Sequence, residues 1–258
     1  VAQNLGIDQI VNFSKELGIY EKPEALLSLS LGSAETTLLK LTSAYCAFVN
    51  GGKLVEPILI DRVQDSEGNT ILNNDKRSCI NCDKISFMGK EYPRVKDKYK
   101  KVFSSQTAYQ VTSLLEGVIQ RGTGKKLKKL RLNLAGKTGT TNENTDAWFI
   151  GFTSNLVIGV YVGMDNPSPL GKFETGSKTA LPIFKNFIEK AVKKSDARPF
   201  KVPDGITMMV VDPVKGEKAR FSSKNTIVES YKSKNVVDGN VLYSNYDRLD
   251  TNNILKFY

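Results

Sequence analysis

Three apolar segments in the middle of the chain constrain its fold more than any other feature. They span residues 135–141, 147–153 and 156–163, and only Ser154 and Asn155 separate the last two. Such a short connection joins antiparallel strands, because a parallel pair needs a crossover of a dozen or more residues. The sequence therefore predicts an antiparallel sheet of three strands.

Segments with helical periodicity lie before and after this sheet. Apolar residues recur every three or four positions in residues 8–17, 37–49, 104–119 and 180–192. Asp8 is expected to cap the first helix, and Ser104 or Ser105 the third. Helices that bracket an antiparallel sheet predict an α+β fold.

Two further segments carry more specific expectations. In the last helix, apolar residues at helical intervals predict one buried face made of Ile183, Phe184, Phe187, Ile188 and Ala191. After Pro57, an apolar run predicts a strand at residues 58–63, and the polar cluster 65–69 predicts a turn into a second strand at 70–72.

Composition divides the chain into a main domain and an appendage. We expect the main domain at residues 1–194, with a polar, lysine-rich excursion at 73–103. Asn, Asp, Lys and Ser dominate residues 195–258, which predicts a small appendage that is partly disordered. No apolar run is long enough to cross a bilayer. We expect residue 1 to be a fragment boundary and any membrane anchor to lie outside this chain.

The chain contains no histidine. This absence excludes Ser-His-Asp, Cys-His and His-metal chemistry within the chain. Proton transfers in an enzyme of this composition must use lysine, carboxylate or hydroxyl groups.

The charge balance is strongly basic. The formal net charge is +10, and five of the cations lie within seven residues, namely Lys125, Lys126, Lys128, Lys129 and Arg131. Nucleic acid, an anionic membrane surface and an anionic polymer are conceivable partners. Because no nucleic-acid-binding signature accompanies the run, we interpret it as a solvated face and expect no nucleic-acid partner.

The segment Gly136-Lys137-Thr138-Gly139-Thr140-Thr141 carries the chemistry. It combines a cation, hydroxyls and a residue without a side chain on one predicted strand. Alternation places Lys137 and Gly139 on one face, with Thr138 and Thr140 on the other. Such a strand at the edge of a sheet can accept an extended peptide. The Lys-Thr-Gly tripeptide alone is weak evidence, since an ordinary strand with a glycine bulge explains it equally well.

The surrounding sequence resembles the transpeptidase domain of class A penicillin-binding proteins, in which Lys-Thr-Gly is the third motif. The resemblance covers most of residues 1–215. Its matching positions include Gly122-Thr123-Gly124, residues 135–142, Asp146-Ala147-Trp148-Phe149, Thr175-Gly176 and residues 202–206. It implies the penicillin-binding or β-lactamase-like fold, truncated at the N-terminus.

The resemblance also implies a reaction and its residues. A serine would attack the D-Ala-D-Ala bond of a peptidoglycan stem peptide, expel D-Ala and pass the acyl group to a neighbouring amine. Lys137, Thr138 and Thr140 would bind the terminal carboxylate of the stem peptide or of a β-lactam, in a substrate strand that extends from Lys137 through Gly139 to Thr141. Lys137 and the backbone N–H of Thr140 would be catalytic, the latter as an oxyanion donor. No cofactor or metal is implied.

The chain departs from the family pattern in one respect. The Ser-x-x-Lys motif occurs nowhere in it, so the chain alone lacks the nucleophile. We expect this motif, the Ser-x-Asn motif and a glycosyltransferase domain to lie upstream. The resemblance implies a membrane-anchored protein whose domain lies on the periplasmic face of the bacterial inner membrane.

Cys79 and Cys82 form a Cys-x-x-Cys pair in the polar excursion. With no histidine and only Cys46 left over, one chain cannot build a complete cysteine-rich zinc site. A disulfide suits the implied periplasmic location best, and two free thiols or a shared metal remain alternatives.

Two other functions remain open. The fragment can belong to a D,D-carboxypeptidase or serine β-lactamase of the same fold, or it can be a non-catalytic peptide-binding or scaffolding module. The upstream sequence would distinguish them, because only the bifunctional synthase carries both Ser-x-x-Lys and a glycosyltransferase domain.

Overall fold

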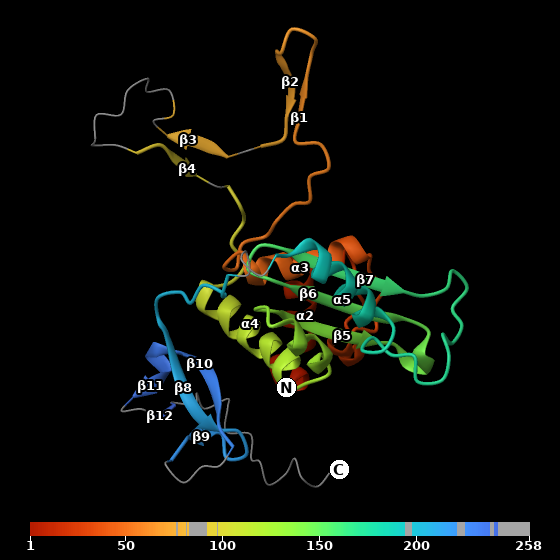
Figure 1. The fold of residues 1–258 in the computed structure, drawn as a ribbon, viewed down its shortest axis with the longest axis vertical. Coiled ribbons are helices and arrows are strands. Elements are labelled where there is room, and N and C mark those ends of the chain that lie inside the picture. The colour runs from red at the N-terminus through yellow and green to blue at the C-terminus, as the bar shows by residue number, and fades with distance from the viewer. Residues whose placement is uncertain are drawn as a thin grey trace. The chain divides into compact units, whose positions relative to one another are not determined.

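The computed structural model describes residues 1–75, 77–80, 82, 92–96, 98–193, 198–220, 225–237 and 240–241 (Figure 1). It divides into two compact units, residues 1–102 and 103–258, which are treated separately below. The last part of the expected appendage, residues 242–258, lies outside the described residues. In the described part of the chain, no helix has the length and apolar character needed to cross a membrane.

The first unit contains helices and two hairpins. Its elements are α1 (Ala2–Leu5), α2 (Ile7–Glu16), η1 (Leu27–Leu31), α3 (Leu38–Val49), β1 (Arg62–Gln64), β2 (Thr70–Asn73), β3 (Ser78–Ile80) and β4 (Arg94–Lys96). Thr37 caps α3, since its side chain accepts a hydrogen bond from the Lys40 N–H at 3.2 Å. The prediction that Asp8 caps α2 is wrong, because Gly6 holds the N-cap and Asp8 lies inside the first turn.

Both hairpins belong to one insertion that is closed at its base. The Leu54 N–H donates to the Lys100 carbonyl at 2.9 Å, and the Val102 N–H donates to the Gly52 carbonyl at 2.8 Å. Every residue of the four strands above this base is exposed. The insertion therefore begins nearer to Gly52 than to residue 73, where composition predicted its start.

The predicted strand at residues 58–63 is only partly correct. β1 begins at Arg62, and β2 pairs with it only from there to Gln64. Ile58, Leu59 and Ile60 are exposed, with Leu59 at 99%. An apolar run forms a strand only where a neighbouring strand pairs with its backbone, and no described strand pairs with these three residues. Of the three, Ile60 accepts a hydrogen bond at its carbonyl from Asn74 Nδ2 at 2.6 Å, which is a side-chain contact. The turn between β1 and β2 is as predicted, because Asp65 Oδ1 accepts from the Glu67 and Asn69 N–H groups.

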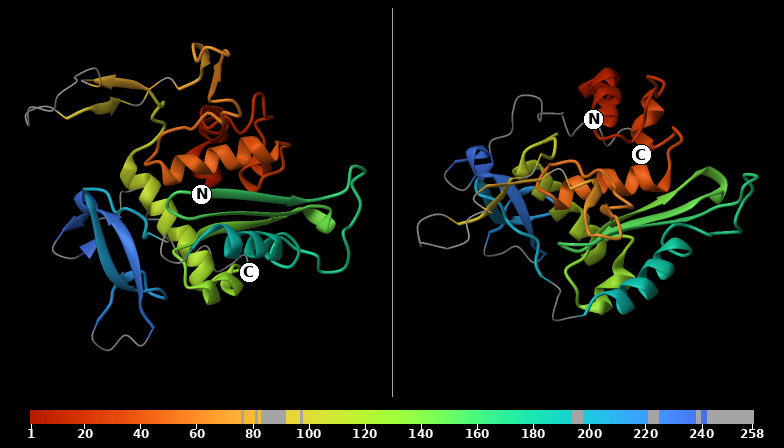
Figure 2. Two further views of the ribbon diagram at one scale, coloured as in Figure 1. Left: turned by 45° about the horizontal axis from the view of Figure 1, so that its top comes forward. Right: turned by 90° about the horizontal axis from the view of Figure 1, so that it is seen from above.

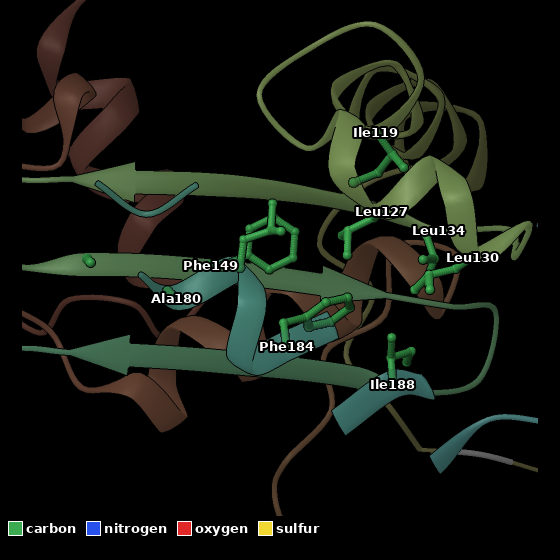
Figure 3. Close-up of a cluster of buried hydrophobic side chains, with 10 residues drawn as sticks. Ile119, Leu127, Leu130, Leu134, Phe149, Ala180, Phe184 and Ile188 are labelled. Carbon is green, nitrogen blue, oxygen red and sulfur yellow. The ribbon is translucent and has the colours of Figure 1, made fainter. Parts of the chain in front are cut away.

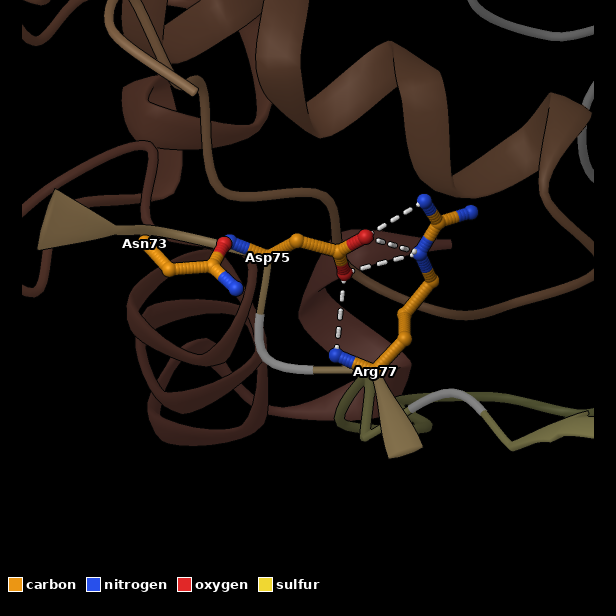
Figure 4. Close-up of polar contacts among 3 residues, drawn as sticks. All are labelled: Asn73, Asp75 and Arg77. Atoms are coloured by element: carbon orange, nitrogen blue, oxygen red, sulfur yellow. Dashed lines mark hydrogen bonds and ion pairs between the residues drawn. The ribbon is translucent and has the colours of Figure 1, made fainter. Parts of the chain in front are cut away.

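Local polar contacts hold the connection between the hairpins (Figure 4). Asp75 accepts from the Arg77 backbone N–H at 3.0 Å and from Arg77 Nη2 at 2.6 Å. The Asp75 N–H donates to Asn73 Oδ1 at 2.9 Å. The hydrogen bonds from Arg77 lower the pKa of Asp75 to about 2. Charge and turn geometry, rather than apolar burial, therefore shape this connection.

The second unit contains the predicted sheet. Its elements are α4 (Ser105–Gln120), η2 (Lys125–Leu130), β5 (Ala135–Thr140), η3 (Asn142–Asn144), β6 (Ala147–Phe152), β7 (Val157–Val162), α5 (Ala180–Ala191), β8 (Ile206–Asp212), β9 (Glu217–Lys218), β10 (Ile227–Lys232), η5 (Ser233–Asn235), β11 (Val236–Val237) and β12 (Asn240–Val241). β5, β6 and β7 are antiparallel and adjacent in that order. The tight hairpin is confirmed, since the Thr153 N–H donates to the Leu156 carbonyl at 2.9 Å.

An apolar core lies between α5 and one face of this sheet (Figure 3). The Phe149 and Phe184 rings meet edge to face, with 4.8 Å between their centroids. The buried cluster comprises Ile119, Leu127, Leu130, Leu134, Ala147, Phe149, Ala180, Leu181, Phe184 and Ile188. The predicted apolar face of α5 is partly wrong, because Ile183 and Phe187 are 50% and 53% exposed and Ala191 is exposed as well. Packing against one face of a sheet buries a single stripe of a helix, and α5 has more apolar residues than that stripe holds.

A second sheet in this unit packs against α4. Its strands run in the order β10-β8-β9. Figure 2 shows this sheet in blue, beside the yellow-green helix α4. Arg121, at the C-terminal end of α4, forms an ion pair with Glu229 of β10 at 2.7 Å. Gln110 of α4 donates to the Ser230 carbonyl at 3.1 Å. Polar contacts thus tie residues beyond 198 to the helix that precedes the main sheet.

We predict that Phe184→Ala in the complete protein lowers the free energy of unfolding by about 3–5 kcal/mol, because it empties the centre of a closed core. Phe187→Ala on the same helix is the matched control and should cost under about 1 kcal/mol, since that ring is 53% exposed. Thermal unfolding of both variants measures the difference. Equal losses would show that α5 does not pack through Phe184.

The Cα atoms of Cys79 and Cys82 lie 5.6 Å apart, a separation that a disulfide can span. We predict that both thiols resist alkylation in protein exported to the periplasm and react in protein made in the cytosol, because the compartments differ in redox poise. Mass spectrometry of alkylated peptides provides the test, with the unpaired Cys46 as an internal control. Two alkylated residues at positions 79 and 82 of exported protein would rule out the bridge.

Candidate active site

Strand β5 carries the predicted site residues, and their faces alternate. Lys137 lies opposite Ile150, and Gly139 lies opposite Trp148. Thr140 faces the α5 side, where its hydroxyl contacts Gly176 in the segment before that helix. Thr138 therefore shares the α5 face, and Lys137 and Gly139 occupy the other.

The backbone of β5 exposes hydrogen-bonding groups along one edge. Among the strands that the structure describes, β5 has only β6 as a neighbour. The Thr141 N–H donates toward β6, to the Asp146 carbonyl at 3.2 Å. Because backbone groups alternate in an antiparallel strand, those of Thr140 and Thr138 point away from β6. Lys137 Nζ donates to the Thr138 carbonyl at 2.7 Å, which agrees with a carbonyl at the open edge.

A glycine holds the Thr140 side chain from the α5 side. The Gly176 N–H donates to Thr140 Oγ1 at 3.1 Å. A Cβ at position 176 would lie 2.4 Å from the Trp148 carbonyl oxygen and 2.5 Å from that of Gly139. Only glycine permits this approach. Because the Thr140 hydroxyl acts as the acceptor here, its own proton remains available for donation to an anion.

The turn after α4 holds the Thr138 side chain. Thr123 Oγ1 and Thr138 Oγ1 are 3.0 Å apart. A Cβ at Gly122 would lie 2.9 Å from Val118 Cα, and one at Gly124 would lie 2.7 Å from Ile119 Cδ1. The turn therefore packs tightly on the end of α4 and fixes Thr123. Sequence reasoning gave Thr123 no role, although a hydroxyl between two glycines was the available signal.

Thr141 is engaged in the turn that follows the strand. Its Oγ1 lies 2.7 Å from Thr145 Oγ1 and accepts from the Asp146 N–H at 2.8 Å. Tyr161 OH donates to Asp146 Oδ1 at 2.8 Å, and this hydrogen bond raises the pKa of Tyr161. The Trp148 and Tyr161 rings contact each other at a tilt of 51°, with 4.6 Å between their centroids. These contacts stiffen the end of the β5–β6 pair.

The structure thus brings together Lys137, Thr138, Gly139 and Thr140 on one open edge, while Thr141 turns to its own loop. Such an edge can add an extended peptide through its backbone and bind an anion through its ammonium and hydroxyl groups. In the residues that the structure describes, no three potential metal ligands gather into a group.

Comparisons with known proteins identify relatives that match most of the chain. Residues 2–189 match the family described as the penicillin binding protein transpeptidase domain. Penicillin-binding protein 1A of Rickettsia prowazekii is 40% identical over 97% of this chain, and that of Pseudomonas aeruginosa is 32% identical over 91%. The chain spans 32% of the length of each of these relatives.

Solved structures agree with this match. Penicillin-binding protein 1A from Haemophilus influenzae superposes with a TM-score of 0.73 at 29% identity, covering 90% of this chain and 37% of that one. PonA1 from Mycobacterium tuberculosis, in complex with penicillin V, has a TM-score of 0.57 at 21% identity, covering 76% of this chain and 52% of that one. The similarity to the Haemophilus influenzae protein supports membership of the same family. The similarity to PonA1 supports only the same fold. The expected α+β fold of the penicillin-binding type is thereby confirmed.

We predict that Thr123→Val lowers the rate at which a fluorescent penicillin labels the complete protein by about fivefold, because one hydrogen bond to Thr138 is lost without a change of shape. Thr123→Ser keeps the hydroxyl and should retain most of the rate. The labelling rate at several penicillin concentrations measures both. Equal rates for the valine and wild-type proteins would contradict a role for this contact.

Proposed function

The chain belongs to the penicillin-binding protein transpeptidase family, and from this membership we propose that the complete protein is a serine D,D-transpeptidase that cross-links peptidoglycan stem peptides. The observation that supports it most directly is the open edge of β5. That edge carries an outward Thr140 N–H beside Lys137 and two threonine hydroxyls. β-Lactams would inhibit the enzyme by acylating its serine.

The proposed reaction has two acyl-transfer steps. A serine hydroxyl attacks the carbonyl carbon of the D-Ala-D-Ala bond, and the C–N bond breaks. The serine proton ends on the departing nitrogen, and D-Ala leaves with a free amine. An amine of a neighbouring stem peptide then attacks the ester, which forms the cross-link and returns a proton to the serine.

This chain would supply the substrate strand for that reaction. The donor peptide adds to the open edge of β5 as a further strand. The outward N–H of Thr140 donates to the carbonyl oxygen as it becomes negative in the tetrahedral state. Lys137 and the hydroxyls of Thr138 and Thr140 bind the terminal carboxylate, which a β-lactam also carries. Thr141 would support this strand through its turn.

We propose that the nucleophile comes from outside this chain, since no serine here has a lysine three residues later. We propose that it lies upstream together with the Ser-x-Asn motif, a glycosyltransferase domain and a membrane anchor. The domain would then act on the periplasmic side of the inner membrane, where its polymeric substrate is found.

We predict that Lys137→Ala in the complete protein lowers penicillin acylation and cross-linking by about 10² or more, because a positioned charge is lost from the carboxylate site. Lys137→Arg should also fail, since a planar guanidinium does not replace a compact ammonium. Stopped-flow acylation and analysis of cross-linked peptides measure the two activities.

Lys190→Ala is the matched control, because Lys190 is an exposed lysine in the last turn of α5. It should leave both activities unchanged. Wild-type kinetics in Lys137→Ala would refute the assignment of this strand.

A further inference from the structure

The basic run at residues 125–131 is arranged by a three-residue repeat, Lys-Lys-Leu-Lys-Lys-Leu. It forms η2, a 3₁₀ helix from Lys125 to Leu130, followed by Arg131 in the left-handed region. With three residues per turn, positions three apart stand above one another. Leu127 and Leu130 form one such row and are only 1% and 8% exposed. The four lysines of η2 therefore form two parallel rows beside the leucines.

Both rows of lysines are exposed to solvent, and the helix that bears them is anchored in the core. Lys125 and Lys128 share one row and Lys126 and Lys129 share the other, while Arg131 follows directly after the helix; all five are exposed. The buried leucines belong to the core beneath α5, so η2 is anchored to that core. A rise of about 2 Å per residue spaces cations within a row by about 6 Å. We call these five residues the η2 cationic surface.

No negative charge offsets this surface locally. The sequence contains no Asp or Glu between Glu116 and Glu143. Among the residues that the structure describes, none of the five cations forms an ion pair, whereas the nearby Arg121 pairs with Glu229. Five unpaired charges on a fixed support repel one another, and an anionic partner relieves that repulsion.

The surface is connected to the candidate active site. η2 starts two residues after Thr123, whose hydroxyl lies 3.0 Å from that of Thr138 on the substrate strand. After η2 the chain returns within five residues to the start of β5 at Ala135. A polymer that engages the edge of β5 can therefore reach these cations with a neighbouring part of its length.

We propose that the η2 cationic surface is a docking site for the carboxylate-bearing peptides of peptidoglycan, separate from the carboxylate site on β5. This inference rests on the proposed function, because a D-Ala-D-Ala stem peptide ends in a free carboxylate. A glycan strand that carries many such peptides is a polyanion with repeated carboxylates. The surface holds the polymer while one stem peptide enters the substrate strand.

The structure favours this polymer over an anionic membrane. Helices that lie on membranes insert apolar side chains between lipids. Here both leucines of η2 are directed into the protein core, so the helix offers the bilayer only charge. An extended row of cations suits an extended chain of carboxylates.

The test is binding of the complete protein to isolated peptidoglycan sheets, measured by co-sedimentation at low salt. The variant K125Q/K126Q/K128Q/K129Q should bind about tenfold more weakly, because exposed charge pairs contribute little singly and more as a group. The control K201Q/K215Q/K218Q/K234Q removes four exposed lysines elsewhere in the second unit and should bind like the wild type. The difference in peptidoglycan binding between the wild type and the η2 variant should decrease as the salt concentration is raised, because salt screens exposed charges.

Amidation of the peptidoglycan carboxylates should lower wild-type binding to the level of the η2 variant. Equal binding by the η2 variant and the wild type, or equal loss in the lysine control, would overturn the proposal. A larger η2-dependent affinity for anionic lipid vesicles than for peptidoglycan would also overturn it and assign a membrane instead.

Penicillin acylation separates this inference from the proposed function. The η2 variant should be acylated at the wild-type rate, because the drug is too small to use the docking surface. An unacylated wild-type protein would defeat the proposed transpeptidase activity. If the η2 variant is acylated normally and still binds peptidoglycan as well as the wild type, only the proposal of the docking surface is refuted.

Discussion

The antiparallel register between β5 and β6 is the constraint on which the candidate site depends. Thr138 lies opposite Phe149, and the Phe149 ring packs on Phe184 of α5. A slip of one residue would exchange the two faces of β5 and turn the Lys137 side chain into that core. Burial of the two aromatic rings therefore determines which backbone groups of β5 point outward. The chemistry of the edge follows from apolar packing beneath it.

Two glycine-containing segments then hold the strand from different parts of the chain. The Thr123 turn reaches Thr138 from the end of α4, and Gly176 reaches Thr140 from the start of α5. In both, a side chain on the glycine would collide with neighbouring atoms. Donors held this firmly need little reorganisation when negative charge develops on a substrate, which is the condition for electrostatic catalysis. The same turn after α4 leads into η2, so the support of the strand and the cationic surface share one piece of backbone.

Sequence reasoning succeeded where short-range pattern decides structure. The two residues between β6 and β7 predicted the hairpin, Ser104 was named as a candidate cap and accepts a hydrogen bond from the Thr107 N–H at 3.1 Å, and alternation predicted the faces of β5. Sequence reasoning failed where the local structure depends on a partner far away in the sequence. The run at residues 58–60 reads as a strand, but no strand pairs with it in the described part of the chain. The Thr123–Thr138 contact joins residues 15 apart. The basic run repeats Lys-Lys-Leu twice, a period of three that fits a 3₁₀ helix, but we interpreted this run by its charge alone.

The central claim is that the open edge of β5 receives the acyl group of the substrate. A crystal structure of the complete protein acylated by a penicillin measures this directly. The account predicts the acyl carbonyl oxygen about 3 Å from the Thr140 backbone nitrogen, with the drug carboxylate in contact with Lys137 or the threonine hydroxyls. An acyl group bound elsewhere, or a Thr140 N–H occupied by another protein strand, would contradict it.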